Sequence, residues 1–135
     1  MNIVLYISSE ETKVSERLLN RICMDFSCDN IEIFNNMADF RRRIYSFPRK
    51  MDVAVILAPD DSQLSDLVQY REVLEDTEII LILPDQNRDT VSKGMRLYPR
   101  FLAYIDSNFD DVSAVLSKLS IKHTHDNILT GRFVA

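Results

Sequence analysis

Glycine is scarce in this sequence, and its scarcity excludes the common nucleotide-binding loops. The 135 residues include only two glycines, Gly94 and Gly131. Loops that wrap the phosphates of a dinucleotide or a nucleoside triphosphate need glycines directly after a strand, where the backbone approaches the phosphates closely. Gly94 falls in a predicted helix and Gly131 in a C-terminal tail. The sequence therefore disfavours both the Rossmann and the P-loop classes.

Tryptophan is absent, and histidine and cysteine occur only twice each. Without tryptophan or a clear aromatic pair to enclose a flavin, a flavodoxin-type cofactor site is disfavoured, and we expect no cofactor. Both histidines, His123 and His125, lie near the C-terminus, away from the predicted strand ends where a Ser-His-acid set would act. Two histidines without a further ligand are a weak signal for zinc. Cys23 and Cys28 are expected to be thiols, because a disulfide adds little to a domain with a full core.

Long apolar runs and a basic N-terminal segment are also missing. No stretch approaches the roughly 18 apolar residues of a membrane span. The N-terminal residues turn acidic at Glu10 without a preceding basic region, which predicts a cytoplasmic protein and no membrane association. The net charge of −5 and the pI of about 5.0 disfavour nucleic acid as a partner.

What the sequence does contain is a repeated pattern of apolar strands followed by amphipathic helices. The run from Val53 to Ala58 is rich in β-branched residues and ends at a proline and two aspartates, as is typical of a strand buried on both faces. The other strands are expected at 2–7, 31–34, 78–83 and 101–105. The helices are expected at about 11–26, 37–47, 62–74, 90–98 and 110–119. The length predicts one domain, which we assign to residues 1–121, with 122–135 as a tail that is either disordered or docked.

Alternating strands and helices with short connections require parallel pairing and right-handed crossovers. We therefore predict an α/β fold: a flavodoxin-like three-layer αβα sandwich with a five-stranded parallel sheet in the order 2-1-3-4-5. In such a sheet, functional groups gather beyond the carboxyl ends of the strands.

This layout, over residues 1 to about 120, resembles the CheY-like receiver domain of two-component response regulators in its element lengths and strand character. The resemblance implies two acidic residues after the first strand that hold Mg²⁺, and an aspartate at the end of the third strand that accepts a phosphoryl group. It also implies a Ser or Thr ending the fourth strand and a Lys ending the fifth, which respond to phosphorylation. In this chain those positions fall on residues of other types: Ser8, Ser9, Leu57, Leu83 and Ser107.

The substitutions remove the chemistry of a phosphorylated receiver. An acyl phosphate forms only on a carboxylate, and Mg²⁺ must neutralise the incoming phosphoryl oxygens. Leucine offers no nucleophile, and two serines are poor Mg²⁺ ligands. The resemblance therefore implies a degenerate receiver, or pseudo-receiver, that is not an enzyme and acts through a protein partner. That partner is either another signalling protein or a second copy in a homodimer.

Three groups of residues remain as candidate sites. Acidic residues follow three neighbouring strands and either cap helices and form turns or bind a divalent metal: Asp60, Asp61, Asp85 and Asp106. A basic run is either a solvated helix face or a contact for an acidic partner or phosphate: Arg41, Arg42 and Arg43. By the resemblance, the face of the fourth helix, fifth strand and fifth helix would bind the partner: Met95, Tyr98, Tyr104, Phe109 and Lys118.

Two alternatives to the pseudo-receiver stay open. One is a receiver-like switch with a rebuilt acidic metal site, and the other is an enzyme on a flavodoxin-like scaffold.

Overall fold

The computed structural model describes residues 1–7, 12–26, 31–46, 51–57 and 60–129, and the structural statements below concern these residues. Ser8, Ser9 and Cys28 lie outside the described residues, as does the end of the tail from residue 130 onward.

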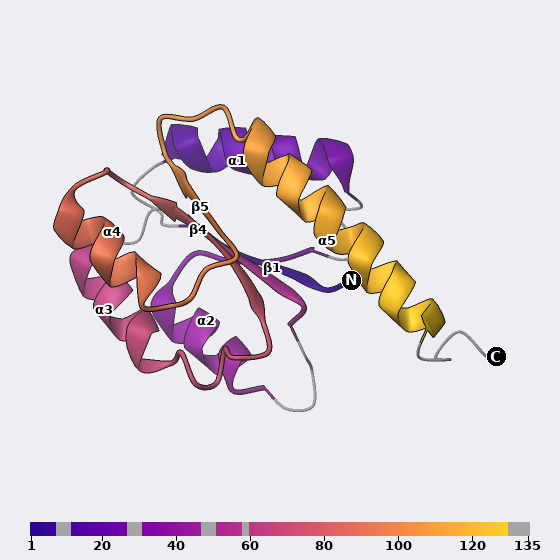
Figure 1. Ribbon diagram of the computed structural model, residues 1–135. Coiled ribbons are helices and arrows are strands. Elements are labelled where there is room, and N and C mark those ends of the chain that lie inside the picture. Colours follow the sequence, from indigo (N-terminus) through magenta and orange to yellow (C-terminus); the bar gives the residue numbers. More distant parts are fainter. Residues whose placement is uncertain (8–11, 27–30, 47–50, 58–59, 130–135) are drawn as a thin grey trace.

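Five parallel strands form one sheet in the order β2-β1-β3-β4-β5 (Figure 1). They are β1 (Ile3–Ile7), β2 (Ile31–Phe34), β3 (Val53–Leu57), β4 (Glu78–Leu83) and β5 (Phe101–Tyr104). The central strand β3 is buried along its whole length, as its apolar run predicts. The predicted fold class and strand order are confirmed.

Five helices connect and follow the strands: α1 (Thr12–Asp25), α2 (Met37–Ile44), α3 (Asp61–Gln69), α4 (Arg88–Met95) and α5 (Asp110–Leu129). Asn36 caps α2, as predicted, because its side chain accepts a hydrogen bond from the backbone N–H of Asp39 at 2.9 Å. The third helix ends at Gln69, and turns rather than helix continue toward β4.

The sheet separates two cores, because alternate residues of each strand point to opposite faces. Val53, Val55 and Leu57 of β3 face the core covered by α1 and α5. Ala54 and Ile56 face the core covered by α2 and α3, to which Leu97 after α4 also contributes. The result is the predicted three-layer sandwich, in which the carboxyl ends of the parallel strands lie at one edge of the sheet.

Helix α5 is longer than the sequence pattern suggested. The tail was expected to begin at residue 122, but the helix continues to Leu129 and extends past the sheet (Figure 1). Neither glycine nor proline occurs between Asp110 and Leu129, so the helix contains neither of the two residue types that most disfavour helical structure. The periodic pattern fades earlier because Ile121 is exposed, whereas Leu119 still packs in the core. Within the described residues, no helix is both long enough and apolar enough to cross a membrane.

Candidate functional site at the carboxyl ends of the strands

The end of β3 is apolar and closed to solvent. Leu57, at the position that the receiver resemblance gives to the phosphoacceptor, has an exposed fraction of 0%. It pairs in register with Ile7 of β1 and Ile82 of β4. Its side chain belongs to the core cluster that α1 and α5 cover. This position therefore presents neither a carboxylate nor an accessible surface.

The two positions that respond to phosphorylation in receivers also carry residues of other types in this chain. Leu83, the last residue of β4, is fully buried in the opposite core and pairs in register with Tyr104 of β5. Ser107 lies in the turn after β5, where its hydroxyl accepts a hydrogen bond from the backbone N–H of Phe109 at 3.3 Å. These residues provide a methyl surface and a turn hydroxyl, where the resemblance would require a phosphate-contacting hydroxyl and a cation.

Three of the four acidic candidates are engaged within the protein. The Asp60 carboxylate caps α3 by accepting a hydrogen bond from the backbone N–H of Gln63 at 2.8 Å. Asp85 accepts a hydrogen bond from the backbone N–H of Asn87 at 2.9 Å. Both contacts agree with the interpretation of these residues as caps and turn formers.

Asp61 has a partner for which the sequence carries no signal. The Lys93 ammonium of α4 lies 2.6 Å from the Asp61 carboxylate and 3.0 Å from the Ser65 hydroxyl of α3. Asp106, the fourth candidate, is exposed after β5. In the part of the chain that the structure describes, no three His, Cys, Asp or Glu side chains are close enough together to hold a metal ion.

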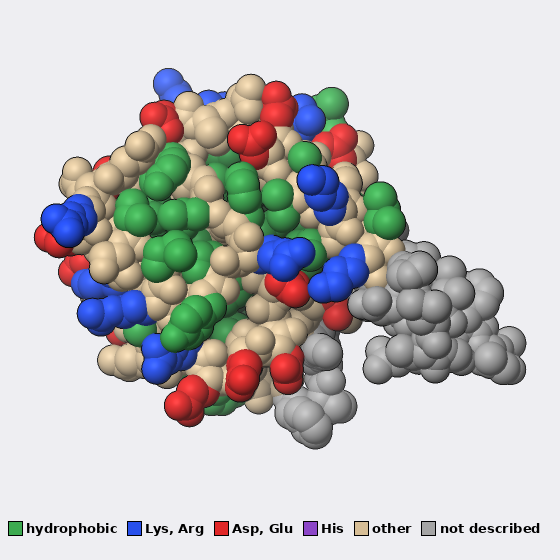
Figure 2. Space-filling view, in the orientation of Figure 1, with side chains coloured by type: hydrophobic (Ala, Val, Ile, Leu, Met, Phe, Trp, Pro, Cys, Tyr) green, Lys and Arg blue, Asp and Glu red, His purple; other side chains and the backbone are tan. Residues whose placement is uncertain are grey.

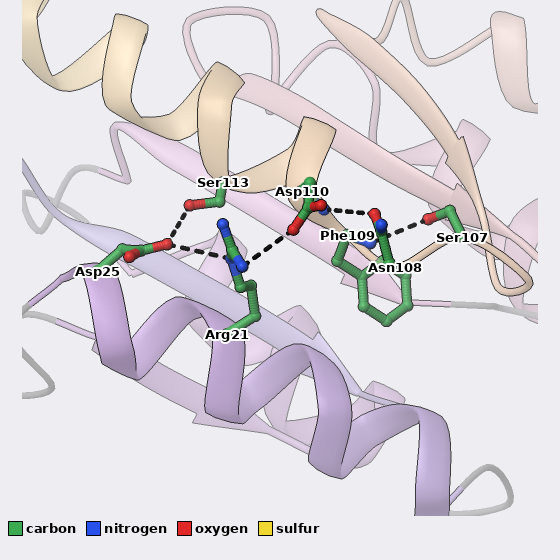
Figure 3. A network of polar contacts seen from close by, with 7 residues as sticks. All are labelled: Arg21, Asp25, Ser107, Asn108, Phe109, Asp110 and Ser113. Atoms are coloured by element: carbon green, nitrogen blue, oxygen red, sulfur yellow. Dashed lines mark hydrogen bonds and ion pairs between the residues drawn. The ribbon is translucent and has the colours of Figure 1, made fainter.

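A polar network joins the β5–α5 connection to helix α1 (Figure 3). Arg21 of α1 lies 2.9 Å from the Asp110 carboxylate and 3.3 Å from that of Asp25. The Ser113 hydroxyl of α5 donates a hydrogen bond to Asp25. One turn earlier on α1, the Arg17 guanidinium donates a hydrogen bond to the backbone carbonyl of Ile105 at 2.8 Å. These contacts hold the loop after β5 against α1.

Arg17 and Arg21 lie on one face of α1, because residues four apart in a helix are neighbours on its surface. Their partners lie far along the chain, and no local pattern in the sequence indicates them.

Comparison with known proteins identifies the fold. The sequence matches no protein-family model and no curated protein. Among solved structures, a pilus assembly-related protein from Burkholderia pseudomallei superposes with a TM-score of 0.64, at 14% identity over 90% of both chains. A response regulator from Thermotoga maritima superposes with a TM-score of 0.60, at 12% identity over 88% of this chain and 97% of that one.

The RcsB response regulator from Salmonella typhimurium matches over 90% of this chain, with a TM-score of 0.56 and 14% identity. This chain spans only 60% of the length of that protein. The chain has the receiver fold. The resemblance predicted from the sequence is thereby confirmed for the fold, and at these identities the likeness concerns the fold alone.

Four of the five residues predicted for the interaction face are at least partly exposed. Met95 and Tyr98 are 51% and 77% exposed. Lys118 is exposed and Tyr104 is partly exposed. Figure 2 shows hydrophobic side chains gathered on the side of the molecule that carries α4 and β5.

Phe109 does not belong to this face, and its prediction as a contact residue was wrong. Its side chain is 1% exposed and packs in the core between the sheet and α1 and α5. The residue has a φ of 64°, a left-handed conformation that turns the ring inward just before α5. The Arg17 guanidinium lies 5.1 Å from the ring centroid. Burial of this ring anchors the β5–α5 connection of the receiver fold.

The basic run on α2 is also only partly a surface feature. Arg41 and Arg42 are exposed, but Arg43 is buried, with its Nε 2.8 Å from the Glu32 carboxylate of β2. Arg43 therefore belongs neither to a solvated helix face nor to an exposed basic patch, and its prediction as part of one was wrong. Nothing near Arg43 in the sequence indicates this partner, because Glu32 lies 11 residues away on another element. A hydrogen bond with the Tyr70 side chain raises the pKa of the Arg41 guanidinium above its ordinary value.

Proposed function

We propose that this chain is a pseudo-receiver: a non-catalytic signalling module that contacts a protein partner independently of aspartyl phosphorylation. The observation that carries the proposal is the fully buried Leu57 at the end of β3. Phosphoryl transfer to a receiver needs a carboxylate at this place, together with Mg²⁺ to neutralise the developing charge. The side chain of Leu57 contains no oxygen atom.

The described residues near the end of β3 do not supply the missing chemistry. Asp60 is the first acid after β3, and its carboxylate is committed to the N-terminus of α3. Ser107 provides a neutral hydroxyl where the receiver pattern would place a cation. A module with these substitutions keeps its fold and its surfaces, and these surfaces are what a partner would bind.

The side of the molecule formed by α4, β5 and α5 is the surface that supports partner binding best. Met95 of α4 is exposed, Tyr104 of β5 is partly exposed, and Lys118 contributes a charge at the border. Methionine and tyrosine are enriched at protein interfaces, where flexible or aromatic side chains supply contact area. The partner is either a signalling protein or a second copy of the chain.

A phosphorylation assay tests the first half of the proposal. The protein is incubated with Mg²⁺ and acetyl phosphate, and its intact mass is measured with and without the donor. We expect no mass increase, because no carboxylate occupies the acceptor position. A phosphoryl adduct that disappears in Asp60→Asn would show that the acid after β3 serves as acceptor, and it would overturn the proposal.

Surface variants test the second half. Met95→Asp and Lys118→Glu are expected to abolish partner capture or self-association, whereas Met24→Asp is the matched control. Met24 is a methionine of α1 with 79% of its surface exposed, so its replacement makes the same chemical change on another face. Self-association is measured by sedimentation. Partner binding or dimerisation that Met24→Asp and Met95→Asp change equally would exclude this face.

A further inference from the structure

A second candidate binding site lies at the opposite end of the sheet from the receiver strand-end positions. A pocket with a volume of about 570 Å³ is formed by the segment that leads from α3 into β4 and by the segment that leads from α4 into β5. Its volume falls within the roughly 300–1,000 Å³ that is usual for ligand pockets. The pocket therefore has room for a side chain and part of the backbone of a bound peptide.

Two leucines and a tyrosine line the pocket beside its polar and charged residues. Leu74 and Leu97 line it and are themselves buried in the core that covers this face of the sheet. Tyr98 also lines it, and its ring lies beneath the Arg71 guanidinium, 5.9 Å from guanidinium carbon to ring centroid. Because both leucines are almost fully buried, the apolar surface that the pocket offers a ligand is mainly the Tyr98 ring, beside which Arg71 lies.

The backbone of Tyr98 has an unfavourable conformation. Its φ is 51°, in the left-handed region that non-glycine residues rarely adopt. Phe109 has a similar φ of 64°, but burial of its ring offsets the cost. Tyr98 lacks that compensation, since most of its side chain is exposed. Strained residues of this kind concentrate at functional sites.

The charges around the pocket select its occupant. Glu72 and Glu75 line the rim, and among the described residues no cation lies within ion-pair distance of either carboxylate. The one lining cation, Arg71, is stacked on the Tyr98 ring. Two carboxylates against one guanidinium give the rim a net negative charge. The complementary ligand is a cation with a hydrocarbon stem.

We propose that this pocket binds a lysine or arginine side chain from a basic segment of a partner protein. The aliphatic stem lies against the Tyr98 ring, as the stems of such side chains do on apolar surfaces, and the charged head is held by Glu72 and Glu75. The site shares no residue with the degenerate phosphorylation positions. The proposed binding of a basic side chain therefore does not depend on the loss of phosphorylation.

A peptide titration tests this proposal directly. The probe is acetyl-Leu-Lys-Leu-amide, and the uncharged control is acetyl-Leu-norleucine-Leu-amide, whose central side chain keeps the stem and lacks the ammonium. We expect the lysine peptide to shift the amide NMR signals of residues 71–77 and 97–98, and the norleucine peptide to bind several-fold more weakly. Equal shifts with both peptides would overturn the charge argument.

Variants separate the roles of charge and ring. Each of Glu72→Gln and Glu75→Gln is expected to weaken the lysine peptide about two- to fivefold, the usual range for exposed ion pairs. Tyr98→Gly should also weaken binding of the lysine peptide, whereas replacing the exposed Glu16 of α1 (Glu16→Gln) should leave the affinity unchanged. Unchanged affinity in the double glutamine variant would refute the proposal.

Two further outcomes would also overturn it. Preferential binding of acetyl-Leu-Glu-Leu-amide would mean that Arg71 recruits acidic ligands. Shifts of the same signals with protein concentration alone would mean that the pocket contacts a second copy.

Discussion

Replacing Leu57 by aspartate would place a carboxylate where response regulators carry their phosphoacceptor, and we expect it to unfold the domain rather than create a site. The side chain is fully buried among the apolar residues that α1 and α5 cover. Losing a buried leucine forfeits about 2–3 kcal/mol of burial free energy. An unpaired carboxylate in the same place costs several kcal/mol more, or takes up a proton instead. The sum, about 5 kcal/mol or more, is comparable to the roughly 5–15 kcal/mol by which domains are stable.

Two variants separate the contributions to this loss. Leu57→Ala removes the packing alone and is expected to cost about 2–5 kcal/mol. Leu57→Asn has nearly the shape of aspartate without its charge. The free energy of unfolding of all three variants is measured by urea titration followed by circular dichroism. We expect Leu57→Ala to be the least destabilised and Leu57→Asp the most destabilised at neutral pH.

The pH dependence of the aspartate variant gives an internal check. Burial raises the pKa of the introduced carboxyl above its value of about 3.9 in the unfolded chain. The folded state then binds the proton more tightly than the unfolded state does. The penalty is therefore smallest below the unfolded pKa and grows as the pH rises to the folded pKa. A Leu57→Asp protein within about 1 kcal/mol of the wild type at neutral pH, when a buried charge costs several, would refute the reasoning.

Three further predictions concern other contacts. Arg43→Ala should destabilise the fold by about 1–3 kcal/mol, because it removes a buried side chain together with its ion pair to Glu32, whereas the exposed Arg42→Ala should stay within about 0.5 kcal/mol; equal losses in urea titrations would contradict this role of Arg43. Asp60→Ala should cost about 0.5–2 kcal/mol through loss of the α3 cap, and an unchanged thermal midpoint would show that the cap contributes nothing. Tyr98→Gly should change the free energy of unfolding by no more than about 1 kcal/mol, because relief of the left-handed strain offsets the entropy cost of glycine. The Tyr98→Gly protein should be more stable than the Tyr98→Ala protein, which retains the strain. The reverse order would mean that the tyrosine conformation is not strained.

The fold was predictable because strong local patterns agree with the global topology. The apolar runs of β3 and β4 are too short and too uniformly apolar for surface elements, so they indicate buried parallel strands. Asn36 caps α2 where its position before the apolar stripe predicts. Once strands and helices alternate, the handedness of the crossovers leaves few possible sheet orders.

The site was less predictable, because its contacts join residues that are distant in sequence. The Lys93–Asp61 ion pair joins two helices, and nothing near either residue indicates it. Phe109 was assigned to the surface because its burial depends on a positive φ, which sequence periodicity does not report. Arg43 looks like one member of an exposed basic run until Glu32 on β2 is placed beside it. The end of α5 was missed because the sequence beyond Leu119 has no clear apolar periodicity, although it contains no glycine or proline up to Leu129.

The most direct test of the pseudo-receiver account is an amide NMR titration of the protein with Mg²⁺, followed by beryllofluoride as a phosphoryl mimic. The account predicts no saturating shift at the strand-end residues Leu57, Asp60, Asp85 and Ser107, because an apolar acceptor position binds neither the metal nor the mimic. Shifts confined to these residues that saturate with Mg²⁺ and grow with beryllofluoride would contradict it. They would mean that an ion-dependent receiver switch has been rebuilt from the acids that follow the strands.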